Sequence, residues 1–320
     1  MFSGKAAIDF LATEVSKIDP GESSHWKKYH SSFQFTGDGF KGLQGFGGWR
    51  KPRGIVLKAV ETFLQSRFRR MGEGGADSSI LDSLAAEIAS TQSRNYDLDL
   101  LRQVLTLSFL RARIPQLQKA NSVACVIGDG FASMTSLLLA SNSASRVVLV
   151  NLTKTLLVDL WYLKLWMGDQ QFGNTVDLVT NKDELQRALD KPISTSTGSG
   201  RVIAIRATDH ELISNCPIDF AINIASMQEM DPIVISAYFA DLRQSISGKP
   251  LHFYCCNRQE KYLPDGTVTR FLEYPWLVED QILVDELCPW HQQYYSFKPP
   301  FFRPYDGPIQ HRLAVMAKTT

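Results

Sequence analysis

The chain has 320 residues, of which 44% are hydrophobic and 21% are charged, and its formal net charge is +1. This composition is typical of globular proteins, and the length suits one large domain or two modest ones. A charge this close to zero gives no general field that would attract nucleic acid or anionic lipid, so we expect neither as a partner.

Five cysteines are present, an odd number without a Cys-x-x-Cys pair, and we expect buried free thiols in a reducing compartment. Neither Cys nor His residues cluster at ligand spacing, so no metal site is expected. Acidic and basic side chains within the first 20 residues argue against a signal peptide, and no apolar run approaches membrane-spanning length. The predicted location is therefore the cytoplasm.

Helical patterns dominate the chain up to residue 119. Apolar residues recur at three- and four-residue spacing over 55–68, 78–90 and 98–110, which predicts three helices. Asp77 or Ser78 is the expected N-cap of the second of these helices, and Asp97 is the expected N-cap of the third. We predict that residues 1–119 form a mainly helical region that helps to bind the acceptor.

The segment 37–48 is rich in glycine, with several aromatic residues in or near it. One interpretation is a flexible connection whose aromatic side chains pack on the body of the protein. The other is a lid or an acceptor-binding loop, because long glycine-rich loops in compact proteins are often functional. The sequence does not decide between the two.

From residue 120 onward, strand-like and helix-like segments alternate, which predicts a doubly wound, mainly parallel α/β sheet over residues 120–320. Strand-like runs near the C-terminus are expected to add an antiparallel edge pair. The expected strands are 124–128, 146–150, 201–207, 220–224 and 251–256, and the expected helices are 133–140, 153–167 and 232–246.

The first predicted strand ends in Gly128-Asp129-Gly130, and a predicted helix follows. A strand, a glycine turn and a helix together form the opening of a nucleotide-type site, because glycine lets the backbone approach a cofactor. The next strand ends at Asn151-Leu152, where a polar side chain can bind a ribose hydroxyl. Ser133 replaces the last glycine of the dinucleotide fingerprint. A cofactor without phosphate, such as S-adenosylmethionine, is therefore favoured.

Ligands of doubly wound sheets bind beyond the carboxyl ends of the strands. Two further strand ends therefore belong to the predicted site. Thr208 and Asp209 follow the third of these strands, and Asp209 is expected to accept a hydrogen bond from an adenine amine. Ser226 to Glu229 follow the fourth and are expected to face the reacting centre.

Four segments, 150–163, 223–230, 237–239 and 253–258, resemble the sugar O-methyltransferases, a branch of the class I S-adenosylmethionine-dependent enzymes. The most specific element is Ser-Met-Gln-Glu-Met at 226–230. The resemblance implies a Rossmann-like, seven-stranded methyltransferase domain with S-adenosylmethionine as donor. It also implies the hydroxyl of a small-molecule sugar or a glycan as acceptor.

By position, the resemblance makes Gly128 and Gly130 the cofactor glycines and Asn151 the counterpart of the ribose-binding acid. The chain departs from the family pattern at two positions. Val126 stands where an acidic residue is expected before the first glycine, and Asn151 is an amide. An amide binds a ribose hydroxyl without the stronger charge-assisted hydrogen bond.

A sugar hydroxyl is a weak nucleophile, so a general base within hydrogen-bond reach is expected. Glu229 is the first candidate, and its alternative role is an acid stabilised by the dipole of the helix over 232–246. His252 is the second candidate, and its alternative role is that of a core histidine. Gln228, Asn257 and Arg258 are expected to bind the acceptor, although Arg258 also suits a surface ion pair.

His25 and His30 are expected on the surface. Two other functions stay open from the sequence. The departures at Val126 and Asn151 would suit a non-catalytic protein that keeps the fold as a binding module. A nucleotide-dependent oxidoreductase is disfavoured by Ser133. The oligomeric state is open and includes a homo-oligomer.

Overall fold

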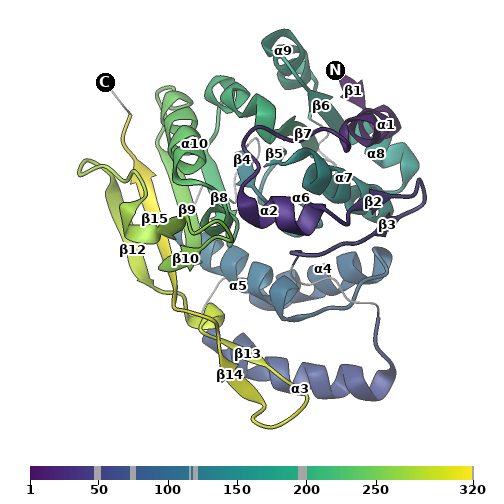
Figure 1. Cartoon of the computed structure of the whole chain (residues 1–320), viewed down its shortest axis with the longest axis vertical. Coiled ribbons are helices and arrows are strands. Elements are labelled where there is room, and N and C mark those ends of the chain that lie inside the picture. Colours follow the sequence, from purple (N-terminus) through teal and green to yellow (C-terminus); the bar gives the residue numbers. More distant parts are fainter. Residues whose placement is uncertain (47–51, 73–76, 115–116, 118–121, 194–199, 319–320) are drawn as a thin grey trace.

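A computed structural model describes residues 1–46, 52–72, 77–114, 117, 122–193 and 200–318 (Figure 1). Its centre is a mixed sheet that has nine strands among the described residues, in the order β1-β6-β7-β5-β4-β8-β9-β15-β12. In that order, the strands are Phe2–Ser3, Val176–Val179, Arg201–Arg206, Arg146–Asn151, Val123–Ile127, Phe220–Ile224, Leu251–Arg258, Ile309–Met316 and Gln281–Leu287.

The six strands from β6 to β9 pair in parallel, whereas β1, β15 and β12 pair antiparallel with their neighbours. The chain runs from β4 to strands on one side of it and returns to β8 on the other side, so the order reverses between β4 and β8. This reversal is the topological switch point of a doubly wound sheet. The predicted Rossmann-like α/β fold is confirmed, and β1 and β6 extend the expected seven strands at the β7 edge.

The strands of the parallel part are buried on both faces. In β4, Ala124 and Val126 pack into one apolar cluster, and Val123, Cys125 and Ile127 pack into another on the opposite face. A strand covered on both sides reads as a continuous apolar run. That is why the sequence predicted five of the six parallel strands, all but β6, closely.

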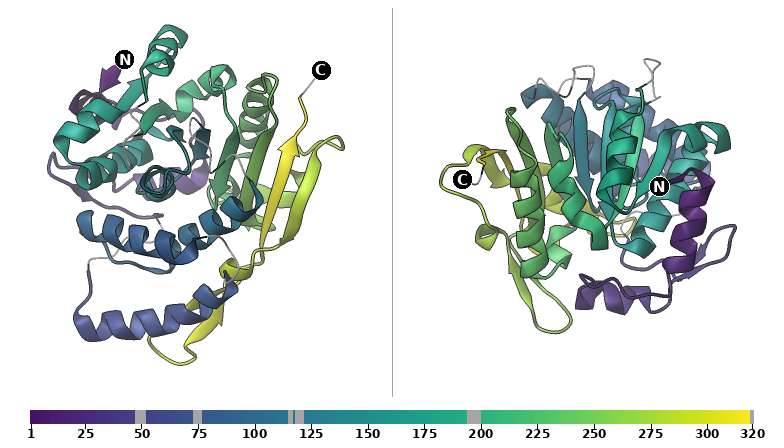
Figure 2. Two further views of the ribbon diagram at one scale, coloured as in Figure 1. Left: turned by 180° about the vertical axis from the view of Figure 1, so that it is seen from behind. Right: turned by 90° about the horizontal axis from the view of Figure 1, so that it is seen from above.

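Helices cover both faces of the sheet (Figure 2). Helices α4, α5, α6 and α7 contribute to the first cluster, and α9, α10 and the 3-10 segment η2 contribute to the second. The helices are α1 Lys5–Glu14, α2 Ser24–His30, α3 Ile55–Met71, α4 Ser78–Thr91, α5 Leu98–Arg113, α6 Ser133–Ala140, α7 Thr153–Met167, α8 Asp169–Thr175, α9 Lys182–Asp190, α10 Pro232–Gln244 and η2 Ala207–Asn215.

The N-terminal region shares its core with the sheet. Strand β1 pairs with β6, and α1 packs on α7. Asp97 caps α5 as predicted, because its side chain accepts a hydrogen bond from the Leu100 amide at 3.2 Å. Asp77 instead pairs its carboxylate with Arg111 at 2.9 Å and makes no capping hydrogen bond.

The expected antiparallel pair near the C-terminus is present as β15 and β12. Helix α3 and the hairpin of β13 and β14 lie side by side away from the main sheet (Figure 1). The remaining short elements are β2 Gln34–Phe35, β3 Phe40–Lys41, β10 Glu260–Tyr262, β11 Val268–Arg270, β13 Gln293–Tyr295, β14 Phe302–Pro304, η3 Met227–Glu229, η4 Phe271–Glu273 and η5 Pro289–His291. Within the described part of the chain, no helix combines the length and the apolar character needed to span a bilayer.

Candidate functional site

A cavity of about 530 Å³ lies at the carboxyl ends of the parallel strands, at the switch point between β4 and β8. All four strand ends that the sequence indicated contribute to its wall. The predicted site residues that line it are Gly128, Asp129, Gly130, Asn151, Leu152, Thr208, Ser226, Gln228 and Glu229. Of the predicted residues, Asp209, His252, Asn257 and Arg258 are not among the described residues that line it.

The glycine turn after β4 needs both of its glycines, for different reasons. Gly128 and Gly130 both have a φ of 71°, in the left-handed region that favours glycine. A Cβ on Gly128 would lie 2.2 Å from the Ser226 Oγ, so this glycine lets the turns after β4 and β8 meet. A Cβ on Gly130 would meet no atom within 4 Å, so Gly130 leaves space at the cavity wall.

Asp129 is turned onto the start of α6. Its two carboxylate oxygens accept hydrogen bonds from the backbone amides of Met134 at 2.8 Å and Thr135 at 2.7 Å. Burial raises the pKa of Asp129, and these hydrogen bonds partly oppose that effect. The amides at this helix N-terminus are therefore satisfied by the protein itself.

Asn151 lines the cavity, but most of its amide is used within the protein. Its Nδ2 donates to the Asp159 carboxylate at 2.8 Å, and its Oδ1 accepts from Thr155 Oγ1 at 2.7 Å and from the Leu152 amide at 3.0 Å. The Asn151 Nδ2 carries two hydrogens, and one of them is used in the hydrogen bond to Asp159. The expected ribose contact would thus depend on the second hydrogen.

Asp159 was not predicted from the sequence, although it is a lone acid in the otherwise apolar helix α7. It is fully buried, and it also accepts from the Ala132 amide at 2.9 Å. Burial, followed by the nearby charge of Asp129, raises the pKa of Asp159 well above its usual range. Asp159 thereby ties the end of β5 to the turn after β4.

The turn after β8 is held by three amide side chains. Asn223 Nδ2 donates to the Ile127 carbonyl at 3.0 Å, and Asn257 Nδ2 donates to Asn223 Oδ1 at 2.8 Å. The backbone amide of Gln228 donates to Asn257 Oδ1 at 3.0 Å. The side-chain Oε1 of Gln228 accepts from the backbone amide of Arg258 at 2.8 Å. Asn257 is fully buried and outside the cavity, so its side chain positions this turn and does not face an acceptor.

Glu229 lies at the end of this turn and faces α2. Its Oε1 is 3.4 Å from the His25 Nε2, and its backbone carbonyl accepts a hydrogen bond from the Ser23 hydroxyl at 2.5 Å. Both side chains of the Glu229–His25 pair are largely buried. The expectation of a surface position for His25 and His30 is wrong, because α2 packs both rings inward, where His30 bonds to Glu22.

The protonation of the pair is set by its surroundings. Burial raises the pKa of Glu229 to about 8, although the positive charges of Lys261 and Arg258 oppose the shift. Burial lowers the pKa of His25 to about 4, and Lys261 adds to that effect. At neutral pH the acid is therefore mostly protonated and the imidazole is neutral, so the pair carries no net charge.

The N-terminal region supplies an aromatic wall of the cavity. Trp26 and Phe46 both line it, and their ring centroids are 5.4 Å apart. Phe46 also packs on Phe131, at 5.4 Å between centroids. The described part of the glycine-rich segment therefore contributes to the cavity, whereas residues 47 and 48 lie outside the described residues.

Arg94 is a cavity residue that no sequence pattern indicated. It is buried, and its guanidinium lies 4.3 Å from the centroid of the Phe131 ring. It donates to Gln92 Oε1 at 3.0 Å and to Ser133 Oγ at 3.3 Å. Its buried Nε has no hydrogen-bond partner among the described residues.

Three predicted site residues lie elsewhere. His252 is buried near the amino end of β9, and its backbone amide donates to the Asp219 carbonyl, so the opposite edge of the sheet holds it away from the cavity. Asp209 pairs with Arg206 at 2.8 Å, outside the cavity wall. The alternative role of Arg258, an ion pair, is observed with Asp306 at 2.8 Å.

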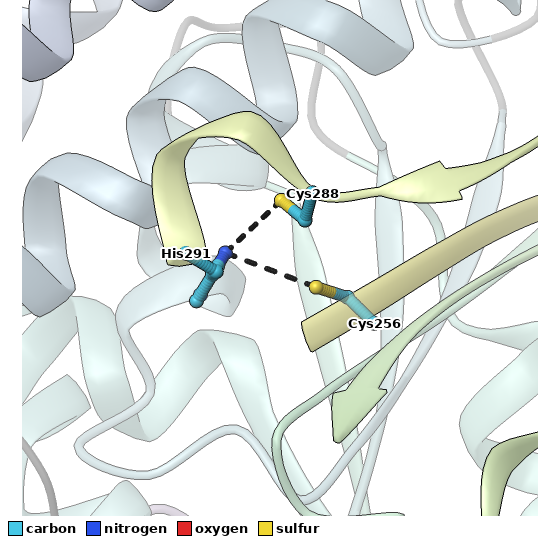
Figure 3. Close-up of side chains that lie close together, drawn as sticks. All are labelled: Cys256, Cys288 and His291. Atoms are coloured by element: carbon cyan, nitrogen blue, oxygen red, sulfur yellow. Dashed lines mark hydrogen bonds between the residues drawn. The ribbon is translucent and has the colours of Figure 1, made fainter. Parts of the chain in front are cut away.

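All five cysteines are buried and free. The structure brings together three Cys and His residues that show no ligand spacing in the sequence. The candidate ligand atoms of Cys256, Cys288 and His291 lie within 4.8 Å of one another (Figure 3). Cys256 comes from β9 and the other two from the segment after β12, and this long separation in the chain hid the cluster from spacing arguments.

No family model and no curated protein matches the sequence. Among solved structures, an S-adenosylmethionine-dependent methyltransferase from Leishmania major is 14% identical, with 68% of this chain and 71% of that chain covered and a TM-score of 0.35. One from Archaeoglobus fulgidus is 12% identical, with 67% and 94% covered and a TM-score of 0.34. A mutant of MtNAS is 12% identical, with 97% of each chain covered and a TM-score of 0.32. The fold assignment rests on the strand order of this chain.

Proposed function

We propose that the protein is an S-adenosylmethionine-dependent O-methyltransferase whose acceptor is the hydroxyl of a sugar or a sugar-like molecule. The observation that carries the proposal is the cavity at the switch point, which Gly130 leaves open and which Glu229 lines. Ligands of doubly wound sheets bind at this place. The choice of acceptor rests on the resemblance of residues 223–230 and 253–258.

The start of α6 favours a cofactor without phosphate. A pyrophosphate at a helix N-terminus is bound by free backbone amides and by the helix dipole. In this chain the Asp129 carboxylate already accepts from the amides of Met134 and Thr135. A pyrophosphate would have to displace a carboxylate of its own charge, so a nicotinamide dinucleotide is disfavoured. S-Adenosylmethionine has no phosphate and, when bound, supplies a methyl group activated by a sulfonium.

Arg94 is the residue we assign to the carboxylate of the cofactor's methionine part. It lies in the cavity wall with a buried, unpartnered Nε, and a guanidinium pairs well with a carboxylate. Because burial lowers the pKa of Arg94, a bound anion would also offset the cost of a desolvated charge.

Glu229 is the residue we assign as the general base. Its carboxylate would take the hydroxyl proton of the acceptor as the oxygen attacks the methyl group. A base of pKa about 8 is well matched to work near neutral pH. His25, at 3.4 Å, is a neutral neighbour that would orient the carboxyl group without adding a second charge.

Isothermal titration calorimetry with S-adenosylmethionine, S-adenosylhomocysteine and NAD tests the cofactor. We expect heat with the two methionine-derived ligands and none with NAD. Heat with NAD alone would contradict the proposal. A panel of sugars, sugar nucleotides and glycans with radiolabelled donor then tests methyl transfer.

One observation favours a second function, a binding module without catalysis. The Asn151 amide, which stands in the place of a ribose-binding acid, is mostly committed to Asp159, Thr155 and Leu152. If the cofactor binds but no acceptor hydroxyl in the panel is methylated, this second function would replace the first.

A further inference from the structure

The cluster of Cys256, Cys288 and His291 is separate from the groups assigned above, and the inference drawn from it holds whether or not the protein transfers methyl groups. Cys256 lies in β9, Cys288 follows β12, and His291 ends η5. All three residues are buried. Figure 3 shows both sulfur atoms directed toward the imidazole of His291.

The distances in the cluster match a four-coordinate metal site. The His291 Nδ1 is 3.2 Å from the Cys288 Sγ and 3.8 Å from the Cys256 Sγ. With Zn–S bonds of about 2.3 Å and Zn–N bonds of about 2.0–2.1 Å, tetrahedral angles separate a nitrogen and a sulfur ligand by about 3.5 Å. The two observed distances lie on either side of this value, so one ion fits between the three atoms with small side-chain shifts.

We propose that Cys256, Cys288 and His291 bind one Zn²⁺ ion. Thiolate and imidazole ligands suit zinc, whereas Mg²⁺ and Ca²⁺ prefer oxygen ligands. Two thiolates also neutralise the charge of the ion, which a buried position requires. Three protein ligands leave one coordination position for water or another small ligand.

The place of the cluster relates the ion to the cavity and to the fold. His291 also lines the cavity, so the ion would lie directly behind the cavity wall. The ligands would join β9 to the segment after β12. Because a metal that binds only the folded chain adds its binding free energy to stability, zinc is expected to stabilise this part of the protein.

The two sulfurs would bind the ion as thiolates, because the thiolate is the form of cysteine that ligates metals. Zinc binding would deprotonate both thiols and release their protons to the buffer.

The test uses the full chain, purified under reducing conditions. We expect about one Zn²⁺ per chain by elemental analysis, or after Zn²⁺ is added to chelator-treated protein. Co²⁺ in place of Zn²⁺ should give the thiolate charge-transfer absorption and the strong visible bands of a four-coordinate ion. The variants Cys288→Ala and His291→Ala should each lose both the bound Zn²⁺ ion and the Co²⁺ spectrum. The matched control is Cys216→Ala, which removes a buried thiol outside the cluster and should keep both.

Zinc should also raise the melting temperature of the wild-type protein, and a chelator should lower it again. This comparison needs no variant and so stands even if a substitution prevents folding. The proposal is overturned if the reduced wild-type protein neither retains nor takes up Zn²⁺ and gives no cobalt spectrum. It is also overturned if Cys256 and Cys288 form a disulfide whose reduction restores no metal binding, or if Cys288→Ala and His291→Ala bind zinc as tightly as wild type.

Discussion

The turns after β4 and β8 meet at the same edge of the sheet, yet they satisfy their acidic groups in opposite ways. The Asp129 carboxylate after β4 accepts two backbone hydrogen bonds at 2.7–2.8 Å. The Glu229 carboxylate after β8 lies 3.4 Å from the His25 ring, and the Gln228 side chain and the charges of Lys261 and Arg258 also act on it.

Asp129 has a structural role at its turn, whereas Glu229 is the group that we assign to the chemistry. Asp129 bonds to the start of α6, and Asp159 bonds to Asn151 and to the turn after β4, so these groups hold the turn in place. Glu229 is buried beside the cavity with a pKa raised to about 8. Because Glu229 lines the cavity beside a neutral imidazole, whereas the Asp129 carboxylate is held by two backbone amides, the turn after β8 is where we place the chemistry.

The largest expected effect comes from a substitution that makes the turns after β4 and β8 clash. In Gly128→Ala the new Cβ would lie 2.2 Å from Ser226 Oγ. The left-handed φ costs about 1–2 kcal/mol, and the overlap adds about 1–3 kcal/mol. We expect urea unfolding to show a large loss of stability and calorimetry to show no cofactor binding.

Gly130→Ala is the matched control, since it shares the φ of 71° but meets no atom within 4 Å. Its free energy of unfolding should therefore fall only by the cost of a left-handed φ at a residue with a side chain. Equal destabilisation by the two substitutions would show that the contact between the turns has no energetic role.

Glu229→Gln is expected to have the next largest effect. Removing a general base should lower turnover by about 10²–10⁴-fold. Cofactor affinity should stay close to that of wild type, because the assigned cofactor contacts lie at the turn after β4 and at Arg94. Turnover and calorimetry measured on the same preparation test this prediction, and unchanged turnover would remove Glu229 from the mechanism.

The raised pKa of Glu229 predicts two pH profiles. Turnover should rise with pH through about 8, because the base acts in its ionised form. Stability should change in the other direction. The pKa of Glu229 in the folded protein is above its usual value of 4.5. The contribution of protonated Glu229 to the free energy of unfolding is therefore fully present below pH 4.5 and is lost as pH rises through about 8. In Glu229→Gln both dependences should flatten. A wild-type rate that is constant across this range would contradict the assignment.

The parallel half of the fold could be predicted from the sequence because each of its elements has a strong local pattern. The helices α6 and α7 and the strand β8 have the predicted bounds, since their apolar runs are buried as the patterns require. The short strands β1 and β6, at one end of the sheet, were missed. They contain too few residues to show a period, and the sheet beside them decides their conformation.

The candidate site was predictable where it follows strand ends and unpredictable where it depends on distant segments. Glu229 and Gly128 were found because they follow buried strands. His25 was missed because only the packing of α2 brings it to Glu229. His252 lies at the amino end of β9, as its place in the predicted strand 251–256 already implied, and its burial agrees with the alternative role of a core histidine.

Asn151→Asp tests whether the network around the turn after β4 is a scaffold. The family pattern suggests that an acid at this position should tighten cofactor binding. In this structure the new carboxylate would replace the amide that donates to Asp159 at 2.8 Å. The pKa of Asp159, which burial already raises, should then rise further. We expect a loss of about 1–3 kcal/mol in the free energy of unfolding, because the buried acid loses its donor.

This loss should grow as pH rises, since a raised folded pKa favours the protonated form. Chemical denaturation at several pH values, with cofactor titration in parallel, measures both outcomes. Tighter cofactor binding at unchanged stability would mean that Asn151 belongs to the binding surface and not to the scaffold.

The smallest expected effect concerns the aromatic wall of the cavity. Phe46 lines the cavity and packs on Trp26 and Phe131, so Phe46→Ala should weaken acceptor contact. We expect the KM for the acceptor to rise by about tenfold, equivalent to about 1.4 kcal/mol, with little change in kcat. Phe35→Ala is the control, because Phe35 packs on Phe40 and Trp161 away from the cavity wall. If both substitutions raise KM equally, the effect comes from loosening the N-terminal region as a whole, and the wall has no direct contact with the acceptor.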